Sequence, residues 1–155
     1  KQNIKTESVY LNVILLDVLA RFSEKIKTKK LLITTNFSKE YRIESDTYLV
    51  TIVLNNLVSN AIKYSNKGSN VIVKLYHSDG KAQCDIIDFG IGIPKEDINM
   101  IFNQFYRSNS TNHPEIKGTG LGLSIVKRLC DLLEIEEKLE REENVGTKAT
   151  ISFTK

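Results

Sequence analysis

The chain has 155 residues, of which 41% are hydrophobic and 26% are charged, enough for one globular domain with a single sizeable core. Its net charge is +3, and Lys and Arg are scattered among nearly as many Asp and Glu, so we expect no nucleic-acid partner. No apolar stretch is long enough to span a bilayer, and the first residues lack the apolar core of a signal peptide. Cys84 and Cys130 lack the spacing of a metal or redox motif, which predicts buried thiols in a reducing compartment.

The first half of the chain mixes strand-like and helix-like patterns. In order, these are a strand at residues 7–11, a helix at 12–27, strands at 31–37 and 40–45, and a long helix at 47–65. Asp46 precedes the long helix and is predicted to be its N-cap, because Asp accepts hydrogen bonds from the free amides of a first helical turn.

The second half continues the mixture. In order, it has strands at 70–78 and 82–89, a helix at about 94–103, a long polar loop, a helix at 121–133, and a last hairpin that turns at about 144–146. Asp79 and Gly80 separate the first two of these strands and are typical of a hairpin turn. We therefore expect an α+β fold, in which one mixed or antiparallel sheet has helices on one face.

Polar residues lie together at the border of the apolar face of the helix at 47–65. Asn56, Asn60 and Lys63 fall within about 60° of one another on a helical wheel, with Tyr64 beside them. Such a stripe can simply be a solvated edge. It can also bind a ligand, because amide oxygens suit Mg²⁺, an ammonium suits phosphate, and a tyrosine ring can pack beside a base.

A glycine-rich turn follows the strand at 82–89, in the sequence DFGIGIP. Gly90 and Gly92 would allow a flat ligand to come close, while Asp88 could accept a hydrogen bond from an amino group such as that of adenine. The alternative is an ordinary turn that ends the strand. The motif is not that of a protein kinase of the serine/threonine type, because the accompanying HRD and VAIK motifs are absent from this short chain.

Two further motifs flank the polar loop. In IFNQFYR, Phe102 and Phe105 fit a core, and Arg107 stands where it could reach a terminal phosphate. In KGTGLGL, alternating glycines precede a helix, so backbone amides and the helix N-terminus could together form an anion cradle. This second motif is neither a P-loop nor GxGxxG.

The four motifs NxxxNAxKY, DxGxGI, FxxFYR and GTGLGL occur in this order over nearly the whole chain. Together they resemble the catalytic ATP-binding domain of bacterial sensor histidine kinases, within the wider gyrase, chaperone, kinase and mismatch-repair ATPase group. The resemblance implies a single domain over 1–155 with the Bergerat fold, an α/β sandwich of about five strands in a mixed sheet, three main helices and an ATP lid at about 107–117.

The resemblance also implies the cofactors ATP and Mg²⁺ and assigns roles to residues. Asn60, with Asn56 beside it, would bind the metal, and Lys63 and Arg107 would act on the phosphates. Residues assigned to the adenine pocket are Tyr64, Asp88, Gly90, Gly92, Ile93 and Thr147. Residues assigned to the phosphate cradle are Lys117, Gly118, Thr119, Gly120, Leu121, Gly122 and Leu123. The last family motif usually reads GxGT, and here only Gly146 and Thr147 match it.

The implied activity is that of a protein-histidine kinase. The domain would present the γ-phosphate of ATP to a histidine on a separate dimerisation domain, for relay to a response regulator. We expect that helical hairpin upstream of residue 1, because neither His77 nor His113 has the helical setting of an acceptor, so this chain alone should not autophosphorylate. A monomeric cytoplasmic fragment of a homodimeric parent is expected, and anchoring of the parent in the inner membrane stays open.

Two other functions stay open from the sequence. One is an ATPase switch, as in gyrase or mismatch-repair relatives, in which a glutamate four residues before the metal-binding asparagine activates water. Asn56 occupies that position here, which favours a kinase. The other is a degenerate signalling module that has kept the fold and lost ATP, against which the intact motifs argue.

Overall fold

The computed structural model describes residues 4–90, 121–142 and 145–153. The main element of the fold is a five-stranded sheet in the order β2-β4-β5-β7-β6. Its strands are β2 (Leu32–Phe37), β4 (Asn70–Ser78), β5 (Lys81–Asp88), β6 (Glu136–Glu142) and β7 (Gly146–Phe153). β2 runs parallel to β4, and the other neighbours are antiparallel, so the sheet is mixed as expected.

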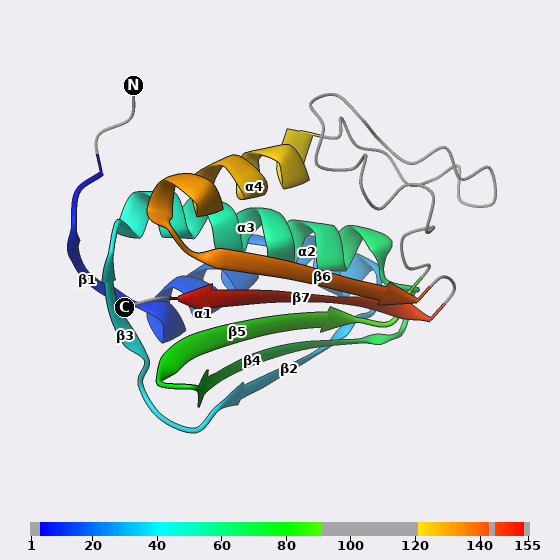
Figure 1. The fold of residues 1–155 in the computed structure, drawn as a ribbon. Helices are drawn as coiled ribbons and strands as arrows, with labels where there is room; N and C mark the ends of the chain where they lie inside the picture. The colour runs from blue at the N-terminus through cyan, green and yellow to red at the C-terminus, as the bar shows by residue number, and fades with distance from the viewer. Residues whose placement is uncertain (1–3, 91–120, 143–144, 154–155) are drawn as a thin grey trace.

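Helices form the second layer, on one face of the sheet (Figure 1). They are α1 (Leu11–Arg21), α2 (Ser23–Thr28), α3 (Thr47–Tyr64) and α4 (Leu121–Leu133). α3 contacts both α1 and α4 and lies against β5, which makes it the central helix of the layer. Among the described residues, no helix is long and apolar enough to cross a membrane.

The local sequence explains how α3 is placed. Asp46 is its N-cap, as predicted, and its Oδ1 accepts a hydrogen bond from the Leu49 amide at 3.0 Å. The apolar arc predicted for this helix is its buried face, formed by Leu49, Val50, Val53, Leu54, Leu57, Val58, Ala61 and Ile62. The polar border of the arc, with Asn56 and Asn60, therefore lies at the edge of the contact with the sheet.

Two details differ from the prediction. The helix expected over 12–27 divides at Phe22, whose amide donates to the Leu19 carbonyl at 3.2 Å and tightens the turn, while its ring packs against the core. The strands expected at 7–11 and 40–45 do not join the main sheet. They form their own antiparallel pair, β1 (Glu7–Tyr10) with β3 (Arg42–Ser45), in which Val9 and Ile43 are buried.

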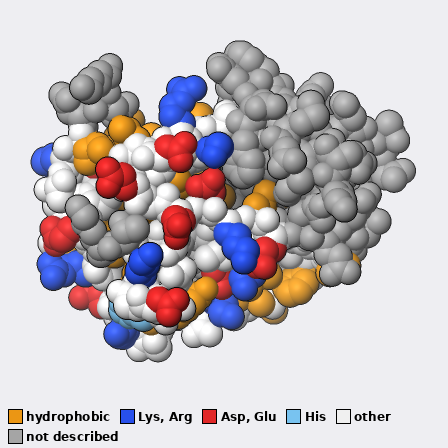
Figure 2. All heavy atoms as spheres, in the orientation of Figure 1, with side chains coloured by type: hydrophobic (Ala, Val, Ile, Leu, Met, Phe, Trp, Pro, Cys, Tyr) orange, Lys and Arg blue, Asp and Glu red, His pale blue; other side chains and the backbone are white. Residues whose placement is uncertain are grey.

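Two further predictions are confirmed, the turn between β4 and β5 and the burial of the two cysteines. Asp79 and Gly80, both with positive φ, form the turn between β4 and β5. Cys84 and Cys130 are buried free thiols. On the face shown in Figure 2, acidic and basic side chains of the described residues are interspersed, and no large patch of one sign gathers there.

Candidate functional site

A pocket lies between α3 and the sheet, at the end of β5. It is lined by two side chains of α3 with polar ends, Asn60 and Tyr64, and by Asp88 of β5 and Thr147 of β7. The apolar part of the lining is Leu57, Ala61, Ile86, Leu139 and Ala149. The structure thus brings together four residues that are up to 87 positions apart in the sequence (147 − 60).

The helical periodicity of α3 and the register of β5 with β7 explain why these four residues lie together. Asn60 and Tyr64 are four residues apart, so they lie on the same side of α3, one turn from each other. Asp88 and Thr147 are paired across β5 and β7. The apolar residues of the lining were not predicted as site residues. Two of them, Ile86 and Ala149, lie two positions from Asp88 and Thr147, so alternation along the strands could have identified them.

Three polar atoms of this pocket are buried without a hydrogen-bond partner. Within the described part of the chain, the three buried side-chain atoms that lack a hydrogen bond are Asn60 Nδ2, Asp88 Oδ1 and Thr147 Oγ1. All three belong to residues that line the pocket. Because an unsatisfied buried polar group costs about 1–3 kcal/mol, such a cluster calls for an explanation, and a ligand with matching donors and acceptors provides one.

The carboxyl group of Asp88 is strongly affected by its surroundings. Asp88 is 5% exposed, and burial raises the pKa of its carboxyl to about 7, against the opposing effects of a hydrogen bond from the Thr147 amide and of the positive charge of Lys29. A carboxyl group with such a pKa, in a pocket, is typical of a functional site.

Asn56 and Lys63 lie near this pocket on α3 but do not line it. The Asn56 Nδ2 donates to the Ile52 carbonyl at 2.7 Å, which leaves the amide oxygen as a free acceptor. The Lys63 ammonium lies 6.0 Å from the centre of the Tyr64 ring. Burial lowers the pKa of Lys63, and the nearby charge of Lys25 lowers it further. Burial also raises the pKa of Tyr64.

Two glycines allow the backbones around Asp88 to approach closely. A Cβ on Gly90 would overlap the carbonyl of Tyr64, and a Cβ on Gly146 would overlap the carbonyl of Asp88. Gly90 also forms an isolated β-bridge with Ser65, the residue after α3. The two residues of the GxGT motif that this chain keeps, Gly146 and Thr147, therefore lie against Asp88.

Several predicted site residues lie outside the described part of the chain. These are Gly92, Ile93, Arg107, Lys117, Gly118, Thr119 and Gly120, together with His113 and the expected helix and lid at about 94–103 and 107–117. Leu121, Gly122 and Leu123 are described by their backbone, and they form the first turn of α4, as predicted. The approach of the glycine run to the pocket therefore stays a prediction.

A two-layer α+β domain with buried, unpartnered polar groups between its central helix and its sheet defines a ligand-binding domain. Residues 45–155 match the family of histidine kinase-, DNA gyrase B- and HSP90-like ATPases. The chain belongs to this family.

Two similar proteins indicate which members of this family the chain resembles. The sensor protein RprX of Bacteroides fragilis is 33% identical over 156 residues, which cover 99% of this chain and 30% of RprX. The sensor histidine kinase WalK of Bacillus subtilis is 35% identical over 118 residues, 75% of this chain and 19% of WalK. The chain thus spans less than a third of either relative.

Solved structures share the fold over nearly the whole chain. A mycobacterial sensor histidine kinase, MprB, has a TM-score of 0.83 at 25% identity, and the match covers 96% of this chain and 97% of that one. The catalytic domain of the histidine kinase ThkA has a TM-score of 0.82 at 27% identity, with the same coverage of each chain. In sequence and fold, the chain is thus a catalytic ATP-binding domain of the sensor histidine kinase type.

Proposed function

We propose that this domain binds Mg-ATP in the pocket between α3, β5 and β7 and donates the γ-phosphate to a histidine on a separate dimerisation domain. The observation that carries the proposal is the convergence of three unpartnered buried polar atoms, on Asn60, Asp88 and Thr147, in one pocket. Family membership supports ATP as the ligand that satisfies them.

The base would occupy the inner part of the pocket. The Asp88 carboxylate would accept a hydrogen bond from the amino group of adenine, and the Thr147 hydroxyl would complete the polar contacts. The Tyr64 ring and the apolar side chains of Ile86 and Leu139 would contact the faces and edges of the base. Adenine is favoured because it combines an apolar surface with an amino group.

The residues present fit a magnesium ion. Asn56 and Asn60 offer amide oxygens one helical turn apart, and Mg²⁺ prefers oxygen ligands. The described residues contain no cluster of three or more His, Cys, Asp or Glu, so phosphate oxygens and water would provide the other ligands. The ion would neutralise charge on the phosphates when it is bound. Lys63 would hold the same phosphates, and Arg107 and residues 117–123 would complete their environment, as the family resemblance implies.

One residue, Asn56, favours phosphoryl transfer over hydrolysis. Another, His77, bears on whether the acceptor lies in this domain or in a separate one. Asn56 is where an ATPase of this group would have its glutamate, and an amide cannot act as a general base towards water. His77 is exposed and pairs with Ala82, whereas Asp88 pairs with Val71. Six residues of strand separate them, roughly 20 Å, so His77 is out of reach of the pocket. The acceptor hairpin, a homodimeric parent and a response regulator therefore belong to this proposal.

Binding is tested by titrating the domain with Mg-ATP in a calorimeter. Asp88→Asn should lose roughly 100-fold or more in affinity, because Asn has one acceptor oxygen and no charge, so it cannot accept from both the Thr147 amide and the amino group of the base. Asp79→Asn is the matched control, since an Asn-Gly turn is as favourable as Asp-Gly and lies at the far end of β5. Equal affinity in both variants would contradict the assignment of the base pocket.

Phosphoryl transfer is tested by mixing the domain, radiolabelled ATP and an acceptor hairpin from the parent protein. Label should appear on the hairpin and depend on Asn60, while Asn55→Ala, a change at another position of α3, should leave it intact. Label on this domain itself, or release of free phosphate without labelled hairpin, would contradict the proposed kinase activity.

A further inference from the structure

Lys29 lies immediately after α2, at a half-buried position beside the end of α3. Its ammonium donates three hydrogen bonds, to the carbonyls of Ile62 at 2.8 Å, Lys63 at 3.1 Å and Ser65 at 2.7 Å. Its own carbonyl accepts a hydrogen bond from the Gly68 amide at 2.9 Å. The residue that follows α2 thus joins the end of α3 to the loop that leads to β4.

These three carbonyls belong to a helix end that lacks the usual cap. The last carbonyls of an α-helix have no partner within the helix, and many helices end in a left-handed glycine that supplies amides to them. Ser65, the C-cap of α3, is extended instead, with φ −73° and ψ 149°. An ammonium has three donors, and its charge is favourable at the negative end of the helix. Lys29 therefore caps this end of α3, together with the Ser65 hydroxyl, which donates to the Ile62 carbonyl at 3.1 Å.

The last turn of α3 is also the part of the helix that meets the pocket. It carries Lys63 and Tyr64, and the chain just after it contacts the segment that follows Asp88. Ser65 forms a β-bridge with Gly90, and the Asn66 amide donates to the Phe89 carbonyl at 3.2 Å. A Cβ on Gly90 would overlap the carbonyl of Tyr64, so the last turn of α3 packs directly against the backbone of Gly90.

We infer that Lys29 is a positioning residue for the proposed nucleotide site, because it fixes the last turn of α3 against the segment that follows Asp88. Lys29 does not line the pocket, so it is no catalytic residue. Its charge nevertheless acts on the site, since it opposes the effect of burial on the pKa of Asp88. This inference rests on the proposed function, which defines the ligand whose affinity Lys29 would control.

The test compares three variants of the domain. Lys29→Met removes the charge and the donors, and Lys29→Arg keeps both. Lys27→Met changes an exposed lysine of the same short helix. We expect Lys29→Met to weaken Mg-ATP binding roughly tenfold or more, because it removes three charge-assisted hydrogen bonds from the turn that carries Lys63 and Tyr64. Lys29→Arg should recover most of the affinity, and Lys27→Met should bind like the unchanged chain.

Affinity of Lys29→Met within twofold of the unchanged chain would overturn the inference, and so would an equal loss in Lys29→Arg. Lys29→Gln, which keeps donors without charge, replaces Lys29→Met if that variant does not fold. Failure of the unchanged chain to bind Mg-ATP would contradict the proposed function instead.

If the unchanged chain does not bind Mg-ATP, hydrogen exchange measured without nucleotide still tests the positioning role of Lys29. The amides of Ser65 and Asn66 should exchange faster in Lys29→Met, relative to the amides of β5, than in Lys27→Met. Unchanged exchange at these two amides would overturn the inference.

Discussion

Asp88 meets two opposing demands at the level of a single residue. In its proposed role, the ionised carboxylate would accept a stronger hydrogen bond from the amino group of a base than the neutral acid would, whereas burial at 5% exposure favours the neutral form. Nucleotide binding that depends on the carboxylate should therefore strengthen as the pH rises through about 7, the pKa of Asp88 in the folded domain. A ligand that donates to the carboxylate would itself lower this pKa.

The same raised pKa makes a prediction for stability. Between the ordinary pKa of Asp, 3.8, and about 7, the folded state binds more protons at Asp88 than the unfolded state does, so this group makes stability fall as the pH rises. Asp88→Asn removes that dependence. The stability of the variant relative to the unchanged chain should therefore increase between pH 4 and pH 8. The increase should be on the order of 4 kcal/mol, since the pKa is raised from 3.8 to about 7 and one pKa unit corresponds to about 1.4 kcal/mol.

Urea unfolding at several pH values measures this difference, and any constant effect of the substitution cancels from the comparison between pH values. Asp79→Asn, at an exposed turn, is the control and should show no such trend. A stability difference between Asp88→Asn and the unchanged chain that stays flat from pH 4 to pH 8 would show that Asp88 is not desolvated in the folded domain.

At the scale of elements, α3 is held at both ends by side chains rather than by its own sequence propensity. Asp46 begins the helix, and its second oxygen also accepts a hydrogen bond from the Lys5 amide at 2.8 Å, which ties the segment before β1 to the helix. Lys29 holds the other end. Because Asn60 and Tyr64 are carried by this helix, its ends determine where the site residues stand.

Asp46→Ala tests the N-terminal end. The substitution leaves the amides of Leu49 and Lys5 without their partner, so the free energy of unfolding should fall by about 1–2 kcal/mol, the usual cost of losing an N-cap. Asp46→Asn keeps one acceptor oxygen and should lose less. Urea denaturation at constant m-value measures both. Equal stability of Asp46→Ala and the unchanged chain would mean that the cap adds nothing to the packing of α3.

Sequence patterns predicted the elements whose signals are local. The helical spacing of apolar residues identified α3 and α4, and Asp79 with Gly80 identified the β4–β5 turn. The polar stripe with Asn60 and the strand end at Asp88 were found in the same way, and the family resemblance placed them in one site. Within the described residues, the pocket contains both.

What the sequence missed depends on contacts between distant residues. The helical pattern continues through Phe22, although the helix divides there and its ring packs against the core. β1 pairs with β3 and not with the main sheet. The alternation of polar and apolar residues predicts a strand but does not specify which strand it pairs with. Lys29 bonds to carbonyls 33 to 36 residues away, and a lysine at the end of a short helix gives no sign of such contacts.

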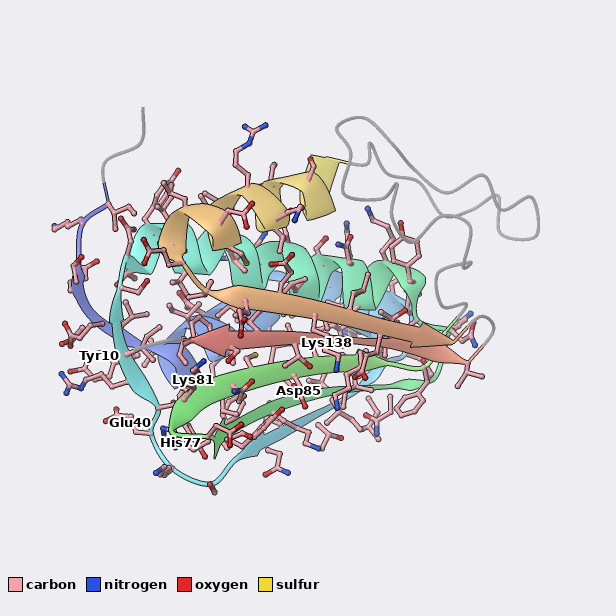
Figure 3. The ribbon with its side chains drawn as sticks, viewed as in Figure 1. Tyr10, Glu40, His77, Lys81, Asp85 and Lys138 are labelled. Carbon is pink, nitrogen blue, oxygen red and sulfur yellow. The ribbon has the colours of Figure 1, made fainter. Side chains whose placement is uncertain are left out.

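At the scale of the whole molecule, the two faces of the sheet serve different purposes. Alternate residues of β5 point to opposite faces, so Asp88 faces the helices and the pocket, whereas Asp85 faces away from them. Asp85 is nevertheless only 2% exposed. Figure 3 labels Asp85 on β5 together with Lys138 on β6. The Asp85 carboxylate accepts hydrogen bonds from Tyr76 of β4 at 3.0 Å and Thr150 of β7 at 2.8 Å.

This carboxylate therefore links three neighbouring strands on the face opposite the described helices. Lys148 lies 3.7 Å from its other oxygen. Burial, with the hydrogen bond to Asp85, raises the pKa of Tyr76 to about 12, so the phenol stays a donor over the whole neutral range. Because Asp85 and Asp88 act on opposite faces of one strand, substitutions at the two positions should separate stability from ligand binding.

Asp85→Ala should lower the free energy of unfolding by about 2–4 kcal/mol, because it leaves two hydroxyl groups without their charged acceptor and removes one of the two carboxylates beside Lys148. Mg-ATP affinity, measured at a temperature where the variant is fully folded, should stay within about twofold of the unchanged chain, as the pocket side of β5 is not altered. Asp88→Asn should give the reverse result at neutral pH, with nucleotide affinity lost and stability kept or increased. If Asp85→Ala instead weakened nucleotide binding as much as Asp88→Asn does, the two faces of the sheet would have to be coupled through β5, and the pocket would depend on the whole strand rather than on the residues that line it.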